Sequence, residues 1–273
     1  MEKYEKNIIP KIESLYSNFT PVEKNIADFF IHNTKNMDFS SKNISEKLYV
    51  SEASLSRFSK KCGFKGYREF LFVYKRSFEE EVPVIIENCT KKVLNTYQEL
   101  LSKSYALVDE NQMRRITKLL TIKKRVYVYG RGSSGLAAQE IKLRFMRIGV
   151  NVESITDSHI MKMNTVLLDS DCIVIGISVS GKTVEILNSL KAAKAKGATT
   201  ILITSNNEYE FKDFCDELLL LAVKENLDNG KAISPQFPIL VMVDIFYTHF
   251  LHTDILNKES LHDYTLNVLN DKD

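Results

Sequence analysis

The chain has 273 residues and a mass of 31.3 kDa, with 44% hydrophobic residues, 26% charged residues and a formal net charge of +2 at pH 7. This length allows about two domains of ordinary size, and the composition excludes a disordered chain. No apolar run approaches the ~20 residues needed to span a bilayer, and the charged N-terminus lacks the apolar segment of a signal peptide. We therefore expect a cytoplasmic protein without a membrane partner.

Charge is distributed unevenly along the chain. Residues 1–77 contain 14 Lys and Arg against 9 Asp and Glu, a net charge of +5, whereas residues 78–273 contain 23 against 26, a net charge of −3. A basic N-terminal part favours an anionic polymer as its partner. The four cysteines form no C-x-x-C pair, so neither a zinc site nor a redox motif is predicted. We expect no metal and no cofactor.

Residues 1–77 are expected to form an all-helical domain. Apolar residues recur there at helical spacing, as at Ile26, Phe29 and Phe30, and no strand-like alternation is present. Within this part, residues 43–67 predict two short helices joined by a tight turn, which is the pattern of a helix-turn-helix domain.

The second helix of this pair carries polar and cationic side chains opposite its apolar stripe. Ser51 is a good N-cap for this helix, and Leu55, Phe58 and Cys62 form the stripe. Gly63 is expected to end the helix in the left-handed conformation. Hydroxyls and cations on the other face suit insertion into the major groove of DNA. The candidate DNA-binding residues are Ser51, Ser54, Ser56, Arg57, Lys60, Lys61 and Lys65.

Each of these residue types predicts a kind of DNA contact. Arg57 is expected to read a guanine edge or hold a phosphate, whereas Lys60, Lys61, Lys65 and the Ser51 hydroxyl are expected to contact phosphates. The alternative is a helical bundle with a basic surface, since cationic helix faces are usually just solvated.

A linker and further helices are expected between this domain and the rest of the chain. The acidic run that leads to Pro83 predicts a linker. Apolar residues at helical spacing between 91 and 122 predict one or two amphipathic helices. We assign residues 78–106 to the linker or a helix, and residues 107–273 to the second domain.

From residue 125, short aliphatic runs alternate with helical segments, which predicts an α/β domain with a five-stranded parallel sheet between layers of helices. The expected strands are RVYVYG, VNVESI, CIVIGIS, TTILIT and ELLLLAV. The expected helices lie near 134–148, 158–168, 183–196, 237–252 and 259–270. Ligands of such sheets bind at the carboxyl ends of the strands, where the strand order reverses.

Three of the loops that follow these strands are rich in hydroxyl groups. Hydroxyls together with backbone N–H groups at a helix N-terminus form a site for a phosphate monoester. Helix capping explains one hydroxyl in each loop, but it does not require the pattern S-x-S-G-x-T. The candidate residues that bind a sugar phosphate are Gly132, Ser133, Ser134, Ser178, Ser180, Gly181, Thr183 and Ser205.

Two of these loops also match nucleotide-binding patterns. GISVSGKT at 176–183 matches the P-loop, and GRGSSG at 130–135 matches the dinucleotide fingerprint. A P-loop also needs a strand that ends in Asp, but the prolines before Asp244 and the apolar residues after it favour a helix. For the dinucleotide fingerprint, Glu153 lies near the expected distance along the chain for a ribose contact, but the second loop would then have no role. A phosphorylated sugar held between both loops uses the two motifs together.

Four segments carry a family resemblance. GRGSS, TDSHIMKM at 156–163 and ISVSGKT are similar to the sugar isomerase (SIS) domain. VSEASLSRFSKKCGFKGYREF at 50–70 resembles the DNA-binding head of the RpiR family of transcriptional regulators. Together these segments extend the resemblance over nearly the whole chain.

The resemblance implies a helix-turn-helix head and a flavodoxin-like SIS domain that senses phosphosugars. It implies that the sugar-phosphate hydroxyls are those of Ser134, Ser178, Ser180 and Thr183, and that Lys182 occupies a variable position. The chain departs from the family pattern at Ser45, where Ala is usual, and at Ser234-Pro235, where Ser-Arg is expected. The second departure leaves the identity of the sugar open.

Regulation and catalysis are the two functions to compare. We expect a non-enzymatic homodimer, or a dimer of dimers, in which a phosphosugar changes the affinity for operator DNA. The alternative is a phosphosugar aldose–ketose isomerase, which needs a base such as Asp157, His159 or Glu185. A standalone isomerase has no need of a helix-turn-helix head, so the sensor is favoured.

Overall fold

The computed structural model describes residues 8–75, 88–224 and 233–270. The chain divides into two compact units, residues 1–86 and residues 87–273. The assigned boundary at 77 and the first part of the assigned linker lie outside the described residues.

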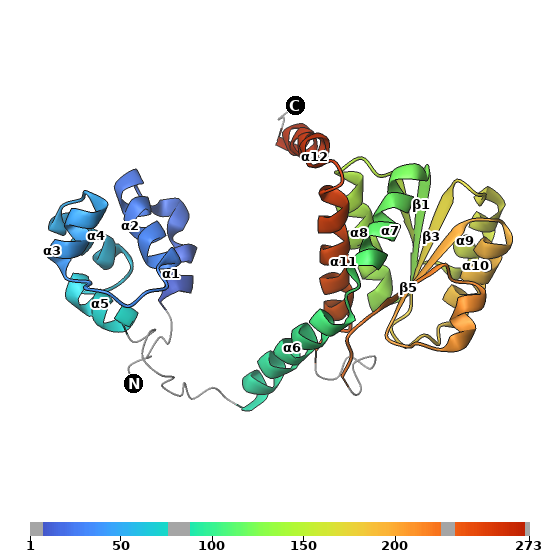
Figure 1. The fold of residues 1–273 in the computed structure, drawn as a ribbon, viewed down its shortest axis with the longest axis horizontal. Helices are drawn as coiled ribbons and strands as arrows, with labels where there is room; N and C mark the ends of the chain where they lie inside the picture. The colour runs from blue at the N-terminus through green and yellow to red at the C-terminus, as the bar shows by residue number, and fades with distance from the viewer. Residues whose placement is uncertain (1–7, 76–87, 225–232, 271–273) are drawn as a thin grey trace. The chain divides into compact units, whose positions relative to one another are not determined.

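The first unit is all helical, as the sequence predicts (Figure 1). Its Thr20 side chain and Glu23 form a capping box that starts the second helix. The elements are α1 Ile9–Ser14, a 3₁₀ turn Tyr16–Asn18, α2 Pro21–His32, α3 Ser41–Leu48, α4 Glu52–Lys61 and α5 Tyr67–Lys75.

The helix-turn-helix consists of α3 and α4, joined by a turn at Tyr49, which adopts a left-handed conformation with φ of 55°. Ser51 caps α4, because its side chain accepts the backbone N–H of Ser54 at 3.1 Å. Gly63 follows α4 with φ of 87°. The predicted cap, turn and stop are therefore confirmed. Ser45, the departure from the family pattern, is buried with its hydroxyl donating to the Lys42 carbonyl.

A cluster of aromatic rings forms the centre of this unit. Phe30 is fully buried, and its ring lies 4.8 Å from those of Phe70 and Tyr74 and 6.3 Å from that of Phe58. The Tyr74 hydroxyl donates to the Phe30 carbonyl at 3.1 Å. Phe30 is on α2, Phe58 is on α4 and the other two rings are on α5. These ring contacts therefore hold α4 in place against α2 and α5.

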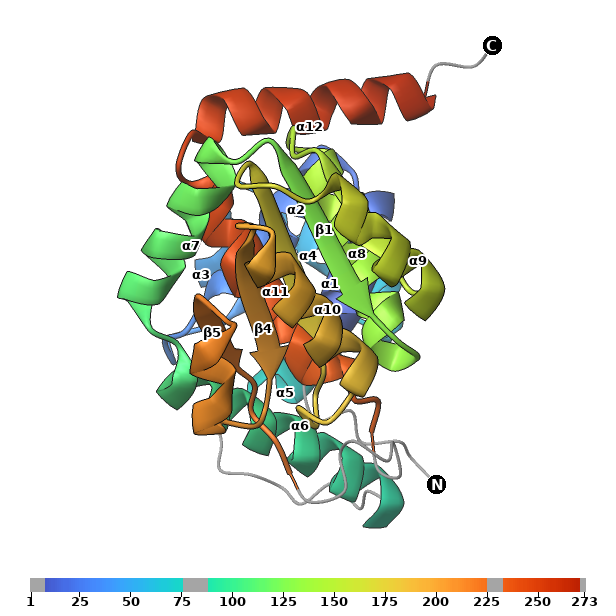
Figure 2. The same cartoon turned by 90° about the vertical axis from the view of Figure 1, so that its right-hand side faces the viewer.

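The second unit is an α/β domain with helices on both faces of a sheet (Figures 1 and 2). Its first elements are α6 Asn88–Leu107, α7 Glu110–Ile122, β1 Arg125–Gly130, α8 Ser133–Met146, β2 Val152–Ile155, α9 Ser158–Asn164 and a 3₁₀ turn Thr165–Leu167. The rest are β3 Cys172–Ile177, α10 Val184–Ala195, β4 Thr199–Thr204, a 3₁₀ turn Tyr209–Asp213, β5 Glu217–Leu220, α11 Gln236–Leu251 and α12 Ile255–Asn270.

The five strands are all parallel in the order β2-β1-β3-β4-β5. Alternate residues of each strand enter different cores: Val126 and Val128 pack with α7, α8 and α11, whereas Tyr127 and Tyr129 pack with α9 and α10. The predicted fold class is therefore confirmed. Helix α6 lies toward the carboxyl edge of the sheet and α12 lies at the opposite edge (Figure 2).

The observed bounds differ in small ways from the predicted ones. The helix expected near 158–168 ends at Asn164 and continues as a 3₁₀ turn, and α12 begins at Ile255, four residues early. Among the described helices, none alone has the length and apolar composition to cross a bilayer; α11 and α12 meet those criteria only as a pair bent by 115°.

Replacing Phe30 by Ala should destabilise the first unit by about 3–5 kcal/mol, because it removes a fully buried ring from a packed cluster. Calorimetry should then show loss of one thermal transition and retention of the transition of the second unit. Tyr49→Ala is the control, since that side chain is 96% exposed. Equal loss in both variants would contradict a core centred on Phe30.

Candidate functional site

Strands β1 and β3 lie side by side, and the helices that follow them cover opposite faces of the sheet. Gly130 and Ile177, the last residues of the two strands, are register partners. The two loops that follow therefore leave the same edge next to each other. In doubly wound sheets this reversal of strand order forms the ligand crevice.

The loop after β1 is built for close backbone approach. A Cβ at Gly130 would lie 2.4 Å from the Ser134 carbonyl oxygen, and Gly132 has φ of 54°. The loop turns directly into α8, whose first turn contains Ser133 and Ser134. Within the described part of the chain, neither of these two hydroxyls has a hydrogen-bond partner.

The loop after β3 is held by its own hydroxyls. Ser178 is buried; its hydroxyl donates to the Thr183 hydroxyl at 2.9 Å and accepts the Thr183 backbone N–H at 3.3 Å. The Ser180 hydroxyl accepts the Lys182 backbone N–H at 3.2 Å. Gly181 has φ of 69°, and a Cβ there would lie 2.8 Å from the Asn206 Cβ. S-x-S-G-x-T thus specifies one loop shape.

The third loop supports the second. Ser205 donates both its hydroxyl, at 2.6 Å, and its backbone N–H, at 3.0 Å, to the Val179 carbonyl. The Thr204 hydroxyl donates to the same oxygen at 3.3 Å. The hydroxyl of Ser205, a predicted ligand-binding residue, therefore already donates its hydrogen bond to the loop backbone. Its contact with a bound sugar phosphate stays a prediction.

An ion pair joins the first loop to the helix after the second. The Arg131 guanidinium contacts the carboxylate of Glu185, which lies in the first turn of α10. Arg131 was not among the predicted residues, because no pattern in a single chain signals a pair 54 positions apart. Lys182 is exposed, and its ammonium has no ion-pair partner among the residues the structure describes.

The helices that follow β1 and β3 both start without a side-chain cap. Gly132 is the N-cap of α8, and Thr183, the N-cap of α10, makes no capping hydrogen bond with its side chain. Simple capping therefore does not account for these hydroxyls. Two uncapped helix N-termini with neighbouring hydroxyl groups have the chemistry to bind a phosphate monoester.

The two nucleotide-binding patterns lack their supporting structure. Asp244 lies in the middle of α11 and pairs with Arg144, so the strand that a P-loop metal site needs is absent there. Gly176 is inside β3, where a Cβ would lie 2.7 Å from the Leu190 side chain. Glu153 pairs with Lys142 at 2.9 Å.

The groups considered as isomerase bases are engaged or exposed. The Asp157 carboxylate caps α9: it accepts the N–H groups of Ile160 at 2.9 Å and His159 at 2.8 Å, and these bonds lower its pKa. The His159 side chain is exposed. Glu185 is occupied by Arg131. None of these three groups is thus both buried and free of a partner.

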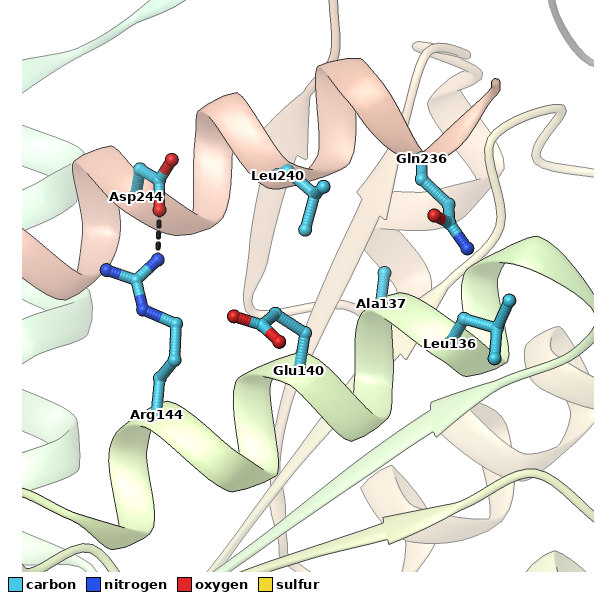
Figure 3. Close-up of a pocket in the computed structure, with 7 residues that line it drawn as sticks. All are labelled: Leu136, Ala137, Glu140, Arg144, Gln236, Leu240 and Asp244. Atoms are coloured by element: carbon cyan, nitrogen blue, oxygen red, sulfur yellow. Dashed lines mark hydrogen bonds and ion pairs between the residues drawn. The ribbon is translucent and has the colours of Figure 1, made fainter. Parts of the chain in front are cut away.

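A groove of about 260 Å³ runs between α8 and α11 beside the first loop (Figure 3). At one end Arg144 pairs with Asp244; at the other, Gln236 points toward the first turn of α8 and donates to the Ser133 carbonyl at 3.3 Å. Ser234, in the departure from the family pattern, accepts the Gln236 backbone N–H at 3.2 Å.

The proposed DNA-binding residues differ in exposure and partners. Ser51, Arg57, Lys60 and Lys65 are exposed. Ser54 is buried, contrary to its predicted place on the free face, because its hydroxyl lies 2.9 Å from that of Ser51 and accepts from Arg57 at 3.0 Å. Ser56 is half-buried, and Lys61 pairs with Glu23 at 2.7 Å. The Ser54 hydroxyl is therefore directed to Ser51 and Arg57 within the protein.

Comparison with known proteins identifies both units. Residues 6–81 match the helix-turn-helix domain of the rpiR family, and residues 119–247 match the SIS domain. The protein is therefore a helix-turn-helix transcriptional regulator with a C-terminal SIS domain. It belongs to the RpiR family of regulators.

Relatives of similar length agree with this assignment. An uncharacterized HTH-type transcriptional regulator of Haemophilus influenzae is 29% identical over 277 residues and covers 96% of each chain. The regulator RpiR of Escherichia coli is 25% identical over 223 residues, which cover 78% of this chain and 75% of that one. The structure of Vibrio vulnificus NanR complexed with ManNAc-6P aligns with a TM-score of 0.59 at 20% identity, over 96% of this chain and 98% of that one.

Ser178→Ala should destabilise the SIS unit by about 1–3 kcal/mol, since it leaves the Thr183 N–H without its buried acceptor. Ser180→Ala, in the same loop, should change the stability by less than about 0.5 kcal/mol, because Ser180 is only half-buried. Urea unfolding measures both. Equal stability of the two variants would contradict the structural role assigned to Ser178.

Proposed function

We propose that the SIS unit binds a phosphorylated sugar between the loops after β1 and β3, and that binding changes the affinity of the helix-turn-helix unit for operator DNA. The observation that carries this is a pair of hydroxyls, Ser133 and Ser134, that have no hydrogen-bond partner among the described residues. They lie at an uncapped helix N-terminus directly beside the Ser178–Thr183 loop. A dianionic phosphate gains most from such a place, because the N–H groups and the helix dipole both favour negative charge.

The proposed ligand contacts fall into two groups. The hydroxyls of Ser133, Ser134, Ser180 and Thr183 and the backbone at Gly132 and Gly181 contact the phosphate. Ser178 and Ser205 hold the loop that presents them, since their hydroxyls already donate within the protein. The ManNAc-6P bound by the Vibrio NanR structure supports a phosphosugar as the ligand class.

We propose that the site binds its ligand without turnover. Aldose–ketose isomerisation needs a base that moves a proton between adjacent carbons. Asp157 is committed to capping α9 and Glu185 to Arg131. Incubation with aldose and ketose phosphates should give no interconversion; turnover lost on Glu185→Gln would establish the isomerase instead.

Binding of DNA by a homodimer, or a dimer of dimers, is the partner arrangement we propose. Helix-turn-helix dimers read half-sites about one helical turn apart, so a ligand that changes the separation of two heads changes operator affinity. Sedimentation of the full chain measures the oligomeric state.

A thermal-shift screen of sugar phosphates tests the ligand. A phosphosugar at 100 times its Kd should stabilise the SIS unit by about 2.7 kcal/mol. The double variant Ser180→Ala, Thr183→Ala should lose this shift and keep DNA binding. ATP with magnesium belongs in the screen; a shift with ATP alone would contradict the sugar site.

Substitution at Arg57 and Lys60 tests the DNA contacts. Arg57→Ala should weaken operator binding by about 1–3 kcal/mol and relax its sequence preference, whereas Lys60→Gln should weaken all sequences alike and reduce the salt slope by about 1. Gel shifts at several salt concentrations measure both. Phosphosugar binding should be unchanged in each variant; loss of it would contradict the separation of the two sites.

A further inference from the structure

Helix α6 packs on the SIS unit apart from the main core. Its buried Leu100 belongs to a small cluster with Ala222 and Ile233, around which Tyr97 and Phe237 are partly buried. None of these residues belongs to either core that covers the sheet. A helix attached through a small satellite cluster can shift without disturbing the sheet.

Ionic contacts hold α6 at the same edge of the sheet as the ligand site. Glu99 accepts from Lys103 and from Lys224, both at 2.6 Å, and these bonds lower its pKa to about 2. Lys103 also donates to the Val223 carbonyl at 3.1 Å. Lys224 and Val223 follow β5, so these contacts lie beyond the carboxyl end of the last strand.

Two consecutive residues at the start of α11 connect the ligand site with α6. Gln236 donates to the Ser133 carbonyl at 3.3 Å, and Figure 3 shows its amide directed toward the first turn of α8. The next residue, Phe237, places its ring edge-on to Tyr97 of α6, with centroids 4.3 Å apart. The first turn of α8 and the middle of α6 are thereby joined through a single helix end.

We propose that Gln236 and Phe237 transmit occupancy of the ligand site to α6, the helix that follows the linker from the DNA-binding unit in the sequence. A phosphate drawn to the N–H groups at the start of α8 reorients the Ser133 peptide, and the Gln236 amide follows the Ser133 carbonyl. Phe237 then displaces Tyr97 and with it α6. This inference rests on the proposed phosphosugar function and assigns Gln236, Phe237 and Tyr97 as positioning residues.

The other end of α11 offers a matched control. There Tyr247 packs edge-on against Phe145 with centroids 5.4 Å apart, and it also lies against the Arg144 guanidinium. Tyr247 lies on α11 and its aromatic pair joins α11 to α8, whereas the pair of Tyr97 joins α6 to α11. Removing either ring costs packing, whereas only Tyr97 belongs to the proposed connection.

The test measures operator affinity of the full chain with and without a sugar phosphate. The probe is the compound that gives the largest thermal shift among glucose 6-phosphate, glucosamine 6-phosphate, ManNAc-6P, ribose 5-phosphate and arabinose 5-phosphate. In the unsubstituted protein it should change operator affinity about 5- to 150-fold. Tyr97→Ala should bind both probe and operator with affinities within about threefold of the unsubstituted protein, but the change caused by the probe should fall below about twofold. Tyr247→Ala should keep the full change.

The results distinguish failure of the proposed connection through Tyr97 from failure of the proposed function. Full coupling in Tyr97→Ala, or equal loss in Tyr97→Ala and Tyr247→Ala, overturns the connection and leaves the sensor function standing. If no probe stabilises the unsubstituted protein, or none changes its operator affinity, the proposed function fails and the connection fails with it. Should Tyr97→Ala not fold, Gln236→Met takes its place: it removes the donor to Ser133 at similar size, and retained full coupling there overturns the proposal.

Discussion

The parallel pairing of β1 with β3 is the constraint on which the proposed ligand site depends. Ladder bonds bring Gly130 beside Ile177, and the helices after these strands must cover opposite faces because the strand order reverses between them. The two hydroxyl loops are therefore adjacent, although they lie about 45 residues apart in the chain. Each loop is then fixed locally: the first by backbone contact at Gly130, the second by the Ser178 hydroxyl and the carbonyl of Val179.

Features that depend on local sequence were predictable. The alternation of aliphatic and helical segments was sufficient to predict the parallel sheet. The N-cap at Ser51 and the end of α4 at Gly63 follow from residue type and position. Features that depend on tertiary contacts were not. Ser54 was predicted on the free face of α4, but it is buried and hydrogen-bonded to Ser51. Helical spacing alone does not show such a hydrogen bond. Arg131–Glu185 and Gln236–Ser133 join residues 54 and 103 positions apart, and no periodicity reports such pairs.

The P-loop match shows why a motif needs its structural context. All its letters are present at 176–183, yet Gly176 serves the packing of β3 against α10, and the acid that a metal site would use lies in a helix, paired with Arg144. What remains of the motif chemically is a pair of helix N-termini and a set of hydroxyls. Those groups favour a nucleotide phosphate and a sugar phosphate alike, so the surrounding loops determine the ligand class.

The loop after β3 also separates positions that can vary from positions that cannot. Ser178 is buried with two hydrogen bonds, and Gly181 has a left-handed backbone close against Asn206. Lys182, the residue after Gly181, is exposed and without an ion-pair partner in the described part of the chain. A substitution at Lys182 alters the charge at the mouth of the crevice at almost no cost in folding free energy. This single exposed position can therefore change the charge of the loop while the hydrogen bonds that shape the loop are kept.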